Sequence, residues 1–242
     1  MHALREGLAR AASAPAVLAG AVAVLVWLAG SSDTRNAIAG FLLWAFLSGG
    51  ILDRYARARP VRARGFFGAC GAHLGAMVRL ALITVLLMAG VHGALAARVS
   101  DPAIRTLAIV LLSAISVLTI YAQVRVVVED RRSALGAMLA AARFVRRNPL
   151  SVVLVVAYGV LIWAGGWILD ALAPPAPGRS TLFFLVVLRA SVLCYLVLSL
   201  YASAIVLFQS RLAHAGYTAA PPIEWPDSPA AEAIANASPF AP

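Results

Sequence analysis

The chain alternates between long apolar runs and short polar segments. Six runs hold few or no charged residues, and most approach or exceed the ~20 residues that a helix needs to cross the hydrocarbon of a bilayer. Because backbone groups in lipid must find their hydrogen bonds within one segment, each run is predicted to be a helix. The predicted spans are residues 14–30, 37–52, 80–97, 106–128, 150–169 and 181–210.

Two longer polar segments, residues 65–79 and 131–147, are predicted to be interfacial helices. In the second, one side of a helix collects Arg132, Arg143, Arg146 and Arg147, whereas the opposite side collects Ala134, Ala137, Met138, Ala141 and Val145, with Phe144 at its edge. Such a helix suits the headgroup layer, so its arginines are predicted to bind anionic lipid headgroups. A basic connecting helix that covers the bundle would explain the same pattern.

The two polar segments resemble each other. Residues 57–86 and 125–154 align without a gap, and nine aligned pairs are identical, among them Arg79 with Arg147. The match predicts an internal repeat of span, interfacial helix and span. Both copies place the interfacial helix on the same side, so the repeat would be parallel, about an axis along the membrane normal.

Small residues mark the first of these helices. Gly68, Gly71 and Gly75 gather on one side, and Gly71 and Gly75 have the spacing that lets helices approach closely in membranes. They are therefore predicted helix-packing residues. A general bias of the chain toward Ala and Gly is the alternative.

The composition agrees with a membrane protein. Hydrophobic residues make up 62% of the 242 residues and charged residues 12%, and the mean hydropathy is +0.88, whereas soluble domains are about one quarter charged. All 20 basic residues are arginine, and the net charge is +10. In a soluble protein this charge would suggest nucleic acid. Beside apolar runs it favours loops held near anionic lipid, and no nucleic-acid partner is expected.

The arginines also predict an orientation. With the N-terminus inside, the outer side holds Arg35, Arg98, Arg105 and Arg179, and the other arginines outside the apolar runs lie inside. Both termini and both arginine-rich loops are therefore predicted to be cytoplasmic. The expected architecture is an all-α, polytopic six-span bundle over residues 1–212 with two cytoplasmic interfacial helices, followed by a disordered tail over residues 213–242.

Arg189 interrupts the last apolar run. It would lie about 12 Å into the bilayer at 1.5 Å per residue, where a charge costs roughly 2.5–3.5 kcal/mol. It either reaches back to the headgroups or faces the bundle interior near Tyr158 or Ser113, where the three would form an intramembrane polar site. Asp170 is the nearest acid in the sequence, but a simple hairpin places it out of register with Arg189.

Motifs for catalysis and metal binding are absent from the sequence. It contains no HExxH, no phosphate-binding loop and no GxSxG. The four histidines have no helical metal-ligand spacing, and the two cysteines, Cys70 and Cys194, favour packing over a disulfide. Neither a cofactor nor a metal is expected, and catalysis is not expected either.

One stretch resembles a known family. Residues 121–160 contain "VVVED", then "SALGAMLAAARFVRRNP", then a new apolar run. They resemble the inner-loop region of the membrane domain of glycerophosphoryl diester phosphodiesterases and related small six-span bacterial membrane proteins. The phosphodiesterase catalytic domain is missing from this chain. The resemblance therefore implies a module of the bacterial inner membrane and carries over no catalytic residue.

The leading expectation is an integral inner-membrane protein without catalysis of its own, which binds anionic lipids, a membrane-protein partner or a second copy of itself. A small transporter or permease subunit is the alternative, and it would need a polar cavity near mid-membrane. A membrane-embedded lipid-modifying enzyme is the second alternative, and it would need acid, base or nucleophile groups clustered at one depth.

Overall fold

The computed structural model describes residues 2–12, 19–22, 34–57, 63–95, 101–172 and 178–217, and the regular elements in these ranges are all helices. The predicted all-helical class is thereby confirmed. The chain divides into two compact units, Met1–Phe208 and Gln209–Pro242, and the packing described below is that of the first. The helices are α1 (His2–Ala12), α3 (Thr34–Arg57), α4 (Ala63–Leu95), α5 (Pro102–Val128), α6 (Ala134–Arg147), α7 (Leu150–Ala171) and α8 (Arg179–Tyr217).

Among the described residues, four helices are long and apolar enough to cross a membrane. They are the stretches Arg64–Leu95 of α4, Pro102–Val128, Leu150–Ala171 and Ser180–Leu212 of α8. The chain therefore has the helices of a membrane protein, but the predicted six spans are not confirmed.

The two remaining predicted spans differ in their outcome. Residues 37–52 lie within α3, and this helix is not among the four found in the described part of the chain. Residues 14–30 lie outside the described residues apart from 19–22.

Helix α4 joins two elements that are predicted to be separate, an interfacial helix and a membrane span. It runs unbroken for 33 residues through the predicted interfacial helix 65–79 and most of the predicted span 80–97. At 1.5 Å per residue it is about 50 Å long, well beyond the ~30 Å of the hydrocarbon. The first repeat copy has Ala81 where the second has Pro149, so nothing breaks the helix there. The internal repeat is not confirmed.

The chain turns sharply on both sides of α6, and each turn has a local cause. Asp130 adopts a left-handed backbone with φ of 50°, which Asp tolerates better than most residues. Ser133 then caps α6, because its hydroxyl accepts a hydrogen bond from the Gly136 N–H at 3.2 Å. At the other end Pro149 disfavours helical backbone at Asn148, so α7 starts anew at residue 150.

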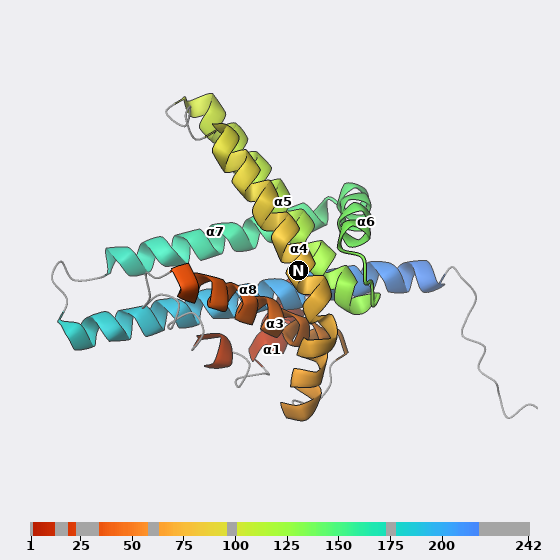
Figure 1. Cartoon of the computed structure of the whole chain (residues 1–242), viewed down its shortest axis with the longest axis horizontal. Helices are drawn as coiled ribbons and strands as arrows, with labels where there is room; N and C mark the ends of the chain where they lie inside the picture. Colours follow the sequence, from red (N-terminus) through yellow and green to blue (C-terminus); the bar gives the residue numbers. More distant parts are fainter. Residues whose placement is uncertain are drawn as a thin grey trace, which may run out of the picture. The chain divides into compact units, whose positions relative to one another are not determined.

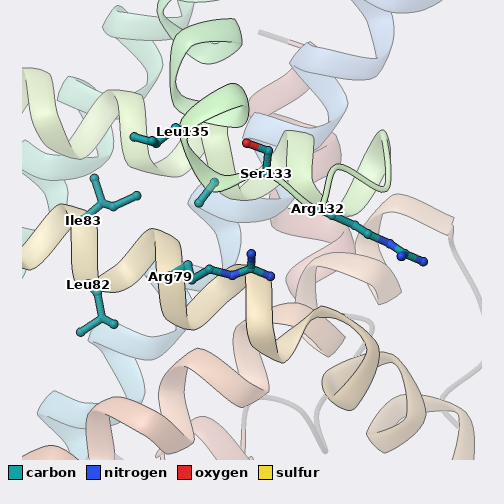
Figure 2. A pocket seen from close by; sticks show the side chains of 7 residues that line it. Arg79, Leu82, Ile83, Arg132, Ser133 and Leu135 are labelled. Carbon is teal, nitrogen blue, oxygen red and sulfur yellow. The ribbon is translucent and has the colours of Figure 1, made fainter.

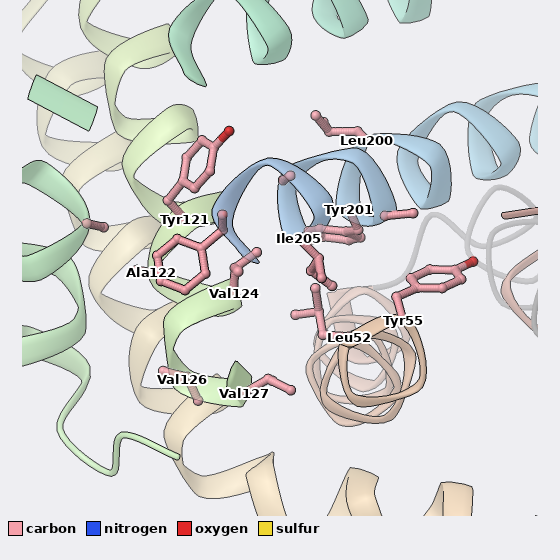
Figure 3. Packing of buried hydrophobic residues seen from close by; sticks show 14 of the residues in the cluster. Leu52, Tyr55, Tyr121, Ala122, Val124, Val126, Val127, Leu200, Tyr201 and Ile205 are labelled. Atoms are coloured by element: carbon pink, nitrogen blue, oxygen red, sulfur yellow. The ribbon is translucent and has the colours of Figure 1, made fainter. Parts of the chain in front are cut away.

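The buried core draws its residues from α1, α3, α4, α5, α6, α7 and α8. Figure 3 shows Leu52 of α3, Tyr121 and Val124 of α5 and Ile205 of α8 in one cluster, and all four are buried. Farther from α6, α4 and α5 lie side by side as a hairpin (Figure 1). Large apolar side chains of this hairpin are exposed, as lipid-facing residues would be, and include Leu82, Val85, Leu86, Leu107, Ile109 and Val110.

The predicted tail begins at residue 213, and its residues 213–217 are described. Helix α8 continues to Tyr217, so residues 213–217 are helical. Residues 218–242 lie outside the described part of the chain.

Candidate functional site

Helix α6 packs on the core through a face of small residues and one aromatic ring. Ala134, Ala137, Ala140 and Ala141 are buried, and Phe144 is 7% exposed. The buried face is thus rotated relative to the predicted one. Phe144 lies inside it rather than at its edge, and the predicted Met138 and Val145 are half-buried.

Phe144 is the contact that explains this rotation. Its ring centroid lies 5.2 Å from that of Tyr121 on α5 and 5.0 Å from that of Phe208 on α8. The Arg125 guanidinium lies over both phenylalanine rings, at 5.9 Å from the Phe144 centroid and 5.1 Å from the Phe208 centroid. The first ring pair is tilted and the second edge-to-face, and such ring pairs, like a cation over a ring face, attract one another. These contacts hold α6 against α5 and α8. We call Phe144, Tyr121, Phe208 and Arg125 together the Phe144 clamp.

Ion pairs connect Arg125 of the Phe144 clamp to the loop before α6 and connect this loop to α3. Arg125 pairs with Glu129 at 3.1 Å, and Arg131 pairs with the same carboxylate. Farther along, Asp130 pairs with Arg57 of α3 at 3.6 Å, and Arg57 also holds Asp53 at 2.9 Å. The loop is therefore tied to α3 and α5, and its acids are already matched by cations.

The outward side of α6 combines arginines with exposed leucines. Arg143, Arg146 and Arg147 are exposed, while Leu135 is 64% and Leu139 63% exposed. On a helical projection Arg146 falls between the two leucines. The structure thus brings three of the four predicted arginines together on an amphipathic outer surface whose apolar part is Leu135 and Leu139.

The fourth predicted arginine, Arg132, lies apart from these three, in the loop at the start of α6. It lines a cavity of about 620 Å³ between α4 and α6 (Figure 2). A neighbouring cavity of about 460 Å³ is also lined by Arg132. We call the two cavities together the α4–α6 groove. The first is lined by Arg79, Leu82 and Ile83 of α4 and by Arg132, Ser133, Ala134 and Leu135.

Arg79 is the groove residue that sequence reasoning missed. It lines both cavities, and its Nε donates a hydrogen bond to the Gly75 carbonyl at 2.9 Å. The one signal for it was its match with Arg147 in the aligned segments. That match did not indicate a partner, because the approach of α4 to Arg132 depends on how distant helices pack.

The residues of the predicted intramembrane polar site are not joined to one another. Arg189 pairs with Asp170, and both side chains are about half exposed, at 48% and 59%. The Tyr158 hydroxyl is hydrogen-bonded to that of Ser203 at 3.0 Å and is buried between α7 and α8. Ser113 is exposed on α5. Asp170 is therefore the partner of Arg189 although a simple hairpin places the two out of register, because the long arginine side chain reaches across the difference in register.

Among the described residues, the predicted packing glycines have little or nothing to pack against. There a Cβ added at Gly68 or Gly71 would meet no atom within 4 Å, and one at Gly75 would meet only the Arg79 guanidinium at 3.7 Å. Close approach occurs instead at α3, where a Cβ at Gly50 would lie 2.4 Å from the Cys70 Sγ. The contact of α3 with α4 thus depends on Gly50.

Comparison with known proteins assigns neither a family nor a function to the chain. No family model matches the chain, and neither a curated protein nor a solved structure matches it. Within the described ranges no three His, Cys, Asp or Glu residues are grouped so as to hold a metal ion.

Proposed function

We propose that the protein is an integral membrane module that holds anionic lipid along α6 and has no catalysis of its own. The observation that carries the proposal is the outer surface of α6, where Arg146 lies between the exposed Leu135 and Leu139. Leucines that enter the acyl boundary beside arginines that reach phosphates are what an interfacial helix requires. Arg143 and Arg147 extend the cationic part of this surface.

The proposal includes a location and an orientation. The module would lie in the bacterial inner membrane, with both termini and α6 on the cytoplasmic side, where the arginine-rich segments favour it. Reporter fusions after Arg143 and after Asp101 test this orientation. We expect a cytoplasmic signal at Arg143 and an outer signal at Asp101, and the reverse pattern would refute it.

The lipid part is tested by changing Arg143, Arg146 and Arg147 together to Gln in the full chain. Each basic residue near an anionic surface contributes about 1 kcal/mol, so the local preference for anionic lipid should fall about 100-fold. The measurement is the ratio of anionic to zwitterionic lipid that co-purifies, determined by mass spectrometry. An unchanged ratio would show that α6 is only a structural connector.

A matched control separates position from net charge. Changing Arg64, Arg105 and Arg211 to Gln removes the same charge from exposed positions outside α6. We expect this variant to keep most of the anionic enrichment. If it loses as much as the α6 variant, net charge rather than the α6 surface recruits the lipid.

A further inference from the structure

The α4–α6 groove differs from the open surface of α6 because it has two chemically distinct ends. Figure 2 shows the Arg79 and Arg132 side chains on one side of the cavity and Leu82, Ile83 and Leu135 on the other. The first cavity alone has a volume of about 620 Å³, which lies within the 300–1,000 Å³ of small-molecule sites. An occupant must therefore match a cationic end and an apolar end at once.

The cationic end keeps a surplus of positive charge. Asp130, the acid that lines the groove, is paired with Arg57, and the lining Arg131 is paired with Glu129. Neither Arg79 nor Arg132 pairs with a carboxylate among the described residues. Two guanidinium groups on one cavity fit a phosphate, whose oxygens accept paired N–H donors.

The start of α6 adds donors to the same end. The first N–H groups of a helix have no partner within it. Ser133 caps Gly136, which leaves the N–H groups of Ala134 and Leu135 without an intrahelical acceptor, and both residues line the groove. Backbone donors and two arginines thus line the same cavity.

The apolar end is incompletely buried by the protein itself. Leu82 is 50% and Leu135 64% exposed, and both line the cavity. An acyl chain lying along these two side chains would cover this surface and pack against it. A free phosphate would leave it uncovered.

We infer that the α4–α6 groove binds one anionic phospholipid, with its phosphate on Arg79 and Arg132 and an acyl chain along Leu82 and Leu135. The inference rests on the proposed function in one respect, which is that the groove must open to the membrane. Apart from Leu135, which both share, it concerns different residues from the α6 surface, namely a single site formed jointly by α4 and the start of α6. Binding of one lipid in the groove and general enrichment of anionic lipid along α6 can therefore be measured separately.

The test uses the purified full chain in detergent and three probes. Dioctanoyl phosphatidylglycerol has both the anionic head and the tails, dioctanoyl phosphatidylcholine has the same tails, and glycerol phosphate has the head alone. Native mass spectrometry gives the number bound and the affinity. We expect one phosphatidylglycerol to bind at least tenfold more tightly than either of the other probes. Equal binding of glycerol phosphate would make this a free-anion site, and equal binding of phosphatidylcholine would remove the role of the arginines; either result overturns the inference.

Variants locate the bound lipid. Arg79→Gln and Arg132→Gln should each weaken phosphatidylglycerol binding about tenfold, because each removes charged hydrogen bonds to the phosphate. Both side chains are exposed, so the fold should persist, which a thermal unfolding scan checks. Leu82→Gln should weaken phosphatidylglycerol while leaving glycerol phosphate unchanged. Wild-type affinity in Arg79→Gln and Arg132→Gln would refute the site.

The α6 surface variant with Arg143, Arg146 and Arg147 changed to Gln separates the two proposals. It should retain the single tight phosphatidylglycerol while losing co-purified anionic lipid. If it loses the tight lipid as fully as Arg79→Gln does, the groove is not a separate site, although the proposed function would stand. If it keeps all of its co-purified lipid and the groove still binds, the proposed function fails while the groove site stands.

Discussion

Replacing Phe144 by alanine should release α6 from the rest of the molecule. The ring is 7% exposed and lies 5.2 Å from the Tyr121 ring and 5.0 Å from the Phe208 ring, centroid to centroid. Removing a buried phenylalanine costs about 3–5 kcal/mol through lost transfer energy and the remaining cavity. Since α6 has 14 residues, it is too short to persist without tertiary contacts. The cost should therefore appear as local opening of α6.

Phe144→Leu provides a graded version of the same change. Leucine keeps most of the apolar volume but loses both ring pairs, at about 0.5–1.5 kcal/mol each, and the cation over the ring. The expected cost is about 1–3 kcal/mol. For both variants, the measurement is the protection of backbone amides in peptides from residues 134–147. It uses hydrogen exchange followed by mass spectrometry, in the membrane-mimetic used for purification. Protection should fall about 100-fold or more for the alanine variant and about tenfold for the leucine variant, while α7 stays protected.

Leu139→Ala is the control on the opposite side of the same helix. Leu139 is 63% exposed, and surface substitutions usually change stability by no more than about 0.5 kcal/mol. Protection of α6 should then stay within a few-fold of the wild type. If Leu139→Ala opens α6 as much as Phe144→Ala does, lipid rather than the Phe144 clamp holds the helix, and the reasoning from ring contacts is wrong.

Three further predictions concern the surroundings of this clamp. Gly50→Ala should lower stability by about 1–3 kcal/mol in thermal unfolding, because its Cβ would lie 2.4 Å from a sulfur atom, whereas Gly71→Ala should be neutral or stabilising; a loss of oligomer in Gly71→Ala would instead reveal packing between copies. Glu129→Gln should cost about 2 kcal/mol, because it leaves a guanidinium that is 14% exposed without its carboxylate; Arg125→Gln should cost at least as much, because it also removes the cation over two aromatic rings, and a smaller loss in Arg125→Gln would contradict the contribution of the rings. Burial raises the pKa of the Tyr55 phenol from 10.0 to about 12, so its neutral form favours the folded state below pH 10 and this contribution is lost as the pH rises to 12; Tyr55→Phe should flatten the alkaline loss of stability in that window, and an unchanged pH profile would exclude Tyr55 as its source.

Local patterns determined the helical class and most element positions. The predicted spans 106–128, 150–169 and 181–210 lie within α5, α7 and α8, because long apolar runs specify helices without reference to distant residues. The exposed arginines of α6 were also predictable, since helical periodicity places them on one side. The break before α7 follows from Asn148-Pro149 alone.

Which residues meet across helices was decided only by the tertiary structure. The periodicity of α6 left Phe144 at the edge of its apolar face, and the buried position comes from Tyr121 and Phe208, which lie on other helices. Arg189 found Asp170 because side-chain reach made up for an offset that a simple hairpin register excludes. The α4–α6 groove likewise depends on the unbroken α4, because this helix places Arg79 in the lining of the same cavity as Arg132. Hydropathy and periodicity are properties of one segment, whereas these contacts depend on where segments far apart in the sequence cross, and that is set by the packing of the whole core.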